Sequence, residues 1–192
     1  MTQPLVVSAL AANPLNIKQT QKRISKAKDD AIAMRKHLWP EVTEEHLWLL
    51  EDKKKKGFSS IPRTMPILMN IIGDASKQVS TKAVPAGRTY LVLWCRVFGE
   101  GIVKIENEMV AASEAGYTGE RSITTWREHI RVLKELGFID YKPGPAGPMQ
   151  FILMLNPYGI VKNLRAKAWV QEGQYTALLQ RAMEIGASSD LS

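Results

Sequence analysis

The chain has 192 residues, of which 45% are hydrophobic and 23% are charged. This balance is typical of a folded protein and excludes a largely disordered chain, and the length suits one ordinary domain with an appendage or two small domains. The formal net charge of +7 favours a polyanionic partner such as nucleic acid, although many proteins without such a partner carry a similar basic excess.

The chain's only cysteine, Cys95, stands in the apolar run YLVLWCRVF, so we expect a buried, inert thiol in a reducing compartment. The N-terminus lacks the charged start and apolar block of a signal peptide. The longest apolar runs are too short to span a bilayer. We therefore expect a cytoplasmic protein with no membrane partner.

Residues 1–14 contain Pro4 and Pro14 and are expected to form a flexible lead-in to a helical N-terminal region at 15–87. A first helix at 15–38 has an apolar stripe opposite a basic face, and Pro40 ends it. A second helix is expected at 43–51. The lysine run at 53–56 is interpreted as a solvated helix end, with phosphate contact as the alternative. An apolar segment at 67–73 must be buried, and a linker follows at 74–87.

Residues 88–157 contain an informative order of elements. We predict a helix at 89–98, with a strand as the alternative because of its aromatic and β-branched residues. A short strand at 102–105 and helices at 106–115 and 121–136 follow. Strands at 138–141 and 149–155 follow, joined by a Pro/Gly-rich turn at 143–148. This is the order of a winged helix-turn-helix domain, with the hairpin as its wing. The expected fold is therefore mainly α with a small β-hairpin (α+β), extended by helices at both ends.

The helix at 121–136 is the candidate recognition helix. At about 100° per residue, Ile123, Trp126, Ile130 and Leu133 share a face that must pack inward. The opposite face carries Arg121, Thr124, Glu128, Arg131 and Glu135, with Thr125 and Arg127 on its flanks. Arginine and threonine near the start of such a helix suit contacts with bases and phosphates in a major groove, although an ordinary solvated face has the same pattern.

The junction VLKELGFIDYKPG at 132–144 resembles the end of the recognition helix and the start of the wing in a group of bacterial and phage winged-helix proteins. That group includes regulators and plasmid replication proteins, and the resemblance covers 88–157. The segments IPRTMP, LWCR, RSITTW and NPYGIVK also look like uncharacterised proteins of proteobacterial plasmids and integrated elements. The wing tip at 143–148 carries no charge and only Lys142 lies beside it, so helix contacts are expected to matter more than wing contacts.

Asn156 and Pro157 are expected to start C-terminal helices at 158–185, interrupted at Gly173. These helices either mediate a homodimer or cover the core of the domain. The tail at 186–192 is expected to be disordered.

No catalytic constellation is apparent. The histidines lie on different predicted elements, without a cluster of Asp, Glu or Cys: His37, His46 and His129. Of these, His129 is expected to be a partly buried structural residue. Gly99-Glu100-Gly101 lacks the remaining glycines of a dinucleotide fingerprint, and Glu106 and Glu108 do not share a helical face. We predict no enzymatic activity, no cofactor and no small-molecule substrate, although an unfamiliar site stays open.

The sequence thus predicts a protein that binds double-stranded DNA, as a transcriptional regulator or a replication or maintenance factor of a bacterial mobile element. The expected contacts are Arg121, Thr124, Thr125, Arg127, Glu128, Arg131 and Lys142. The alternative is a winged helix that binds other proteins in a larger assembly, which the uncharged wing and the acidic residues on the helix favour.

Overall fold

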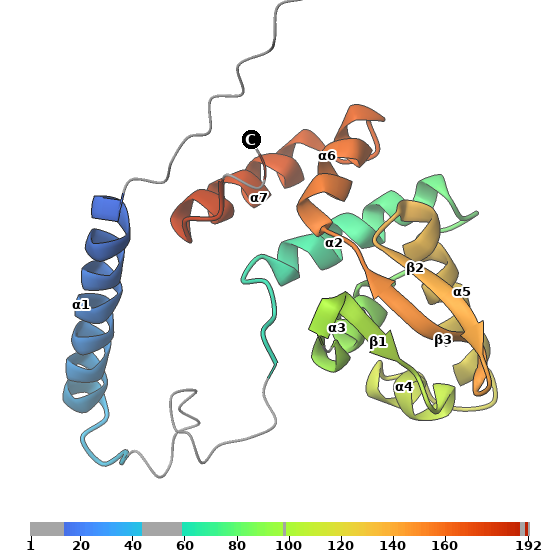
Figure 1. Ribbon diagram of the computed structural model, residues 1–192, viewed down its shortest axis with the longest axis horizontal. Coiled ribbons are helices and arrows are strands. Elements are labelled where there is room, and N and C mark those ends of the chain that lie inside the picture. The colour runs from blue at the N-terminus through green and yellow to red at the C-terminus, as the bar shows by residue number, and fades with distance from the viewer. Residues whose placement is uncertain (1–13, 44–58, 98, 189–190, 192) are drawn as a thin grey trace, which may run out of the picture. The chain divides into compact units, whose positions relative to one another are not determined.

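A computed structural model describes residues 14–43, 59–97, 99–188 and 191 (Figure 1). The chain divides into two compact units, 1–56 and 57–192. In the first, α1 (Pro14–Leu38) confirms the predicted helix, and Arg35, Lys36 and His37 stand in its last turn, where cations meet the negative helix end. Met34 and Leu38 of the apolar stripe are exposed. The helix expected at 43–51 and the lysine run at 53–56 lie outside the described residues, apart from Thr43.

The second unit begins with a close crossing of two helices, α2 (Met65–Ala75) and α3 (Gly87–Arg96). A short 3-10 turn (Ser76–Gln78) follows α2. A Cβ atom added at Gly87 would stand 2.7 Å from the Met69 Cβ and 2.9 Å from its Cα, so only glycine fits this crossing. The buried segment predicted at 67–73 is confirmed within α2, where Leu68, Ile71 and Ile72 are fully buried.

After α3 come a 3-10 turn (Gly99–Gly101), β1 (Ile102–Lys104), α4 (Glu108–Glu114) and α5 (Ser122–Leu136). The start of α4 is two residues later than expected because the Asn107 side chain caps it and accepts from the backbone N–H of Met109 at 2.9 Å. Gly137, at a φ of 90°, ends α5 as predicted.

The chain then forms a hairpin of β2 (Ile139–Gly144) and β3 (Gly147–Met154), and β3 also pairs with β1. The sheet is antiparallel with strand order β1-β3-β2. The turn between β2 and β3 is Pro145-Ala146, tighter than the expected span of 143–148, because Pro143 is accommodated at a register shift between Lys142 and Gly144. Mostly helical with a small three-stranded sheet, the described chain confirms the predicted α+β class.

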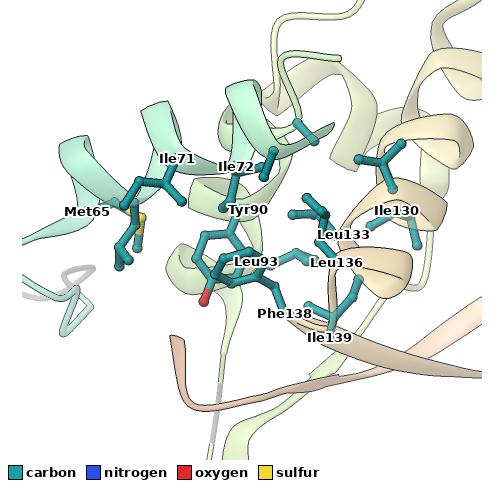
Figure 2. Close-up of a cluster of buried hydrophobic side chains, with 14 of the residues drawn as sticks. Met65, Ile71, Ile72, Tyr90, Leu93, Ile130, Leu133, Leu136, Phe138 and Ile139 are labelled. Atoms are coloured by element: carbon teal, nitrogen blue, oxygen red, sulfur yellow. The ribbon is translucent and has the colours of Figure 1, made fainter. Parts of the chain in front are cut away.

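The core lies between α2, α3, α5 and the inner face of the sheet. Figure 2 shows side chains from the three helices pointing toward one another, with Phe138 and Ile139 below them. Tyr90 of α3 contacts the ring of Phe138 edge to face, with ring centroids 5.4 Å apart. Val103 and Ile152 point inward from the sheet and are buried.

Two C-terminal helices complete this unit: α6 (Pro157–Ala166) and α7 (Glu172–Glu184). The predicted interruption at Gly173 is wrong, because that glycine lies in the first turn of α7. The break falls at 167–171 instead, where Ala168 adopts a φ of 59°. Tyr158 and Thr64 share a buried hydrogen bond of 2.8 Å, and Gln174 donates to Asp74 at 2.6 Å, so α6 and α7 both hold α2. Within the predicted tail, Leu191 is buried.

The expectation for Cys95 is wrong, because its side chain is exposed. Tyr90 and Leu93 lie on the inward face of α3, and the helical repeat carries Cys95 to the opposite side. An apolar run in a helix therefore does not bury each of its members. No described helix is long and apolar enough to cross a membrane.

Candidate nucleic-acid interface

The exposed stripe of α5 consists of side chains three and four residues apart. All five members of the stripe point to solvent: Arg121, Thr124, Glu128, Arg131 and Glu135. On the predicted inward face, Trp126, Ile130 and Leu133 are fully buried, whereas Ile123 is half-buried. The helical repeat thus separates a core face from a polar face. Of the other predicted contacts, Thr125 is half-buried.

Arg121 and Arg131 are the stripe's two basic side chains, and neither forms an ion pair with a carboxylate in the described ranges. Arg121 stands at the N-cap position of α5 and makes no side-chain capping bond. The first backbone N–H groups and the positive pole of the helix dipole therefore accompany its guanidinium. This end of α5 is chemically suited to an anionic partner such as phosphate.

Arg127, in contrast, forms an ion pair with a carboxylate of the neighbouring helix. Its Nε and Nη2 groups donate to the Glu108 carboxylate at 3.0 and 2.5 Å, across the contact between α5 and α4. The Glu108 side chain is 11% exposed and the Arg127 side chain 38% exposed. The hydrogen bonds that Arg127 donates to Glu108 raise the pKa of its guanidinium above its ordinary value. The pair fixes the start of α4 against α5, which makes Arg127 a positioning residue in this structure.

A second polar link ties the turn before α5 to α3. Tyr117 shares hydrogen bonds with His129 Nδ1 at 2.7 Å and with the Thr89 hydroxyl at 2.9 Å. His129 is 4% exposed, so it is more deeply buried than the partly buried histidine that the sequence predicts. Burial lowers the pKa of His129, and the nearby Glu128 carboxylate opposes that shift without cancelling it. The imidazole therefore joins α3, the turn and α5 in its neutral form.

The wing contributes little charge. Lys142 is 77% exposed, and its Nζ lies 4.0 Å from a carboxylate oxygen of Asp140. That carboxylate is engaged more closely by Lys134 of α5, at 2.7 Å, and this hydrogen bond lowers the pKa of Asp140. A hydrogen bond within the hairpin stabilises the turn at its tip, where Gln150 Oε1 accepts from the backbone N–H of Ala146 at 3.1 Å. The structure thus leaves α5, rather than the wing tip, as the side of this region that presents basic groups.

The sequence predicts the α5 stripe but not Glu108 as the partner of Arg127. Opposite charges on two neighbouring predicted helices were visible in the sequence, yet their separation of 19 residues gives no register between α4 and α5. The described residues hold no group of three or more His, Cys, Asp or Glu that could bind a metal ion. Comparisons with protein-family models, curated proteins and solved structures found no match to this chain.

Proposed function

We propose that the region from α3 to β3 is a winged helix that binds double-stranded DNA, with α5 as its recognition helix. The element order α3, β1, α4, α5, β2, β3 and the sheet order β1-β3-β2 support this fold. The observation that carries the functional proposal is the α5 stripe, where Arg121 and Arg131 stand exposed beside Thr124 without a carboxylate partner in the described ranges.

The remaining predicted contacts take different roles in this proposal. Thr124 and Thr125 reach base edges near the start of α5, whereas Arg127 holds α4 in place. Glu128 lies within the stripe, and its carboxylate repels the phosphates of DNA. In this proposal it therefore faces the bases rather than the sugar-phosphate backbone. Lys142 adds a phosphate contact from the wing. A stripe of alternating charge gives weak nonspecific attraction, and sequence preference therefore comes from a few directed contacts.

The test is binding to a random double-stranded DNA pool, with selected sites then measured by fluorescence anisotropy across a salt series. Arg121→Ala and Arg131→Ala should each weaken binding by about 5- to 150-fold if the side chain contacts a base, which corresponds to about 1–3 kcal/mol. A contact with phosphate alone should weaken all sequences equally and reduce the salt slope by about one.

Arg63→Ala is the matched control, because Arg63 is also exposed and also unpaired in the described ranges but precedes α2. It removes the same charge from another element, so it should change affinity far less than either α5 variant. If all three variants bind the selected sites equally, α5 is not the recognition surface.

A further inference from the structure

The outer face of the sheet presents two cross-strand rows of side chains. Ile102, Leu153 and Asp140 are register partners in one row. Lys104, Phe151 and Lys142 are register partners in the other, two residues further along each strand. The residues between the rows, such as Val103 and Ile152, point into the core. The outer face thus has an apolar centre on β3 and β1 with charged groups around it.

Three large apolar side chains are exposed on this face. Ile102 is 47% exposed, Leu153 41% and Phe151 37%. Together with Asp140 and Lys142 they line a shallow groove of about 310 Å³. The Phe151 ring lies against the backbone of Gly144, where an added Cβ would stand 2.6 Å from the ring. Phe151 is therefore held in place on the face, and this order lowers the entropy lost when a partner covers it.

We propose that this face binds the same face of a second copy of the chain, with a two-fold axis that runs across the strands between the two rows. Under that symmetry each row faces the other row of the partner copy. Phe151 then packs on Leu153, and Lys142 meets Asp140, each contact occurring twice. The Lys142–Asp140 pair within one copy is loose, at 4.0 Å, so Lys142 can exchange it for the Asp140 of the facing copy, whose other carboxylate oxygen Lys134 engages at 2.7 Å.

Two sheets can also pack face to face about a two-fold axis parallel to the strands, and the charges favour the axis across the strands instead. An axis parallel to the strands would place Lys142 opposite Lys104, and this like-charge contact opposes association, although the ion pair of Lys104 with Glu106 at 2.6 Å reduces the repulsion. An axis across the strands replaces that repulsion with two Lys142–Asp140 pairs. A mixed rim around an apolar centre is also the usual anatomy of a protein interface, whereas a nucleic acid would face the Asp140 carboxylate.

The proposed dimer is weak. Stable interfaces use about 20–30 residues on each side, and this face offers far fewer, so association is expected only at high protein concentration. The dimer engages Lys142, which is also the proposed wing contact with DNA, so its test contains no DNA.

The test is sedimentation velocity of the full chain from about 5 to about 500 µM. The average mass should rise toward that of a dimer. Leu153→Glu should abolish the rise by placing a charge opposite Phe151. Met183→Glu is the matched control, because Met183 is an equally apolar exposed side chain on α7 and the variant should associate like the parent. Circular dichroism verifies that each variant is folded.

A charge exchange tests the register itself. Asp140→Lys and Lys142→Asp should each prevent self-association, because like charges then face each other. A mixture of the two variants should form heterodimers, since each copy offers the charge that the other lacks. A parent that stays monomeric throughout the series, a dimer that tolerates Leu153→Glu, or a mixture that fails to associate would each overturn the proposal.

Discussion

The ion pair between Arg127 and Glu108 allows a quantitative test of how α4 and α5 are joined. Removing one partner of a fully buried pair costs about 3–5 kcal/mol, whereas an exposed pair contributes about 0.2–1 kcal/mol. Here the carboxylate is 11% exposed and the guanidinium 38% exposed, with two donor groups on one carboxylate. We therefore expect a coupling free energy of about 1–2 kcal/mol.

The two single substitutions should differ in size. Arg127→Ala leaves a nearly buried carboxylate without a cation and should be the more destabilising, by about 2 kcal/mol. Glu108→Ala leaves Arg127 able to turn to solvent and should destabilise by about 1 kcal/mol or less. The double variant should lose less than the sum of the two, as expected for residues in contact.

Urea unfolding of the four proteins in this double-mutant cycle measures the coupling free energy directly. Anisotropy with selected DNA sites supplies the functional control. In the Glu108→Ala background, removing Arg127 should leave DNA affinity unchanged, because the proposed role of Arg127 is to position α4. Zero coupling, or a larger loss from Glu108→Ala than from Arg127→Ala, would refute this account of the pair.

Two further predictions concern packing and pH. Gly87→Ala should destabilise by about 1–3 kcal/mol in urea unfolding, because the new Cβ meets the backbone of Met69, whereas Gly73→Ala, with nothing within 4 Å, should stabilise by about 0.5–1 kcal/mol. The pKa of His129 lies below its ordinary value of 6.5, so the unfolded chain binds this proton first and stability falls as pH drops below that value. Melting curves between about pH 7.5 and 5.5 should therefore show that His129→Gln loses less thermal stability than the parent as the pH falls. If the stability of both proteins depends on pH equally, His129 is not the group responsible.

The features that local patterns determine could be predicted from the sequence. The boundaries of α5 follow from its apolar repeat and from Gly137, and Trp126, Ile130 and Leu133 occupy the core as that repeat requires. The hairpin follows from two apolar segments around a Pro/Gly-rich turn. The same apolar repeat also predicts which side chains of α5 are exposed and form the stripe.

The features that depend on non-local geometry could not be predicted. The pairing of β1 with β3 sets the two outer rows, and no local signal places Lys104 beside Phe151. The packing of α2 on α3 and α7 was equally hidden, because 67–73 reads only as a buried segment. The break at 167–171 was missed because Ala168 adopts a positive φ that alanine rarely takes, so glycine was the expected marker.

The basic excess of the chain therefore says less about function than the placement of individual charges. In the second unit, carboxylates engage most of the basic groups near the proposed interface, including Arg127 and Lys134 of α5, which pair with Glu108 and Asp140. Such pairs give the surface little net attraction for phosphate at physiological salt. Arg121 and Arg131 lack such partners in the described ranges, so they retain full capacity for directed contacts. If α5 binds DNA, discrimination between sequences should therefore be large relative to the nonspecific affinity.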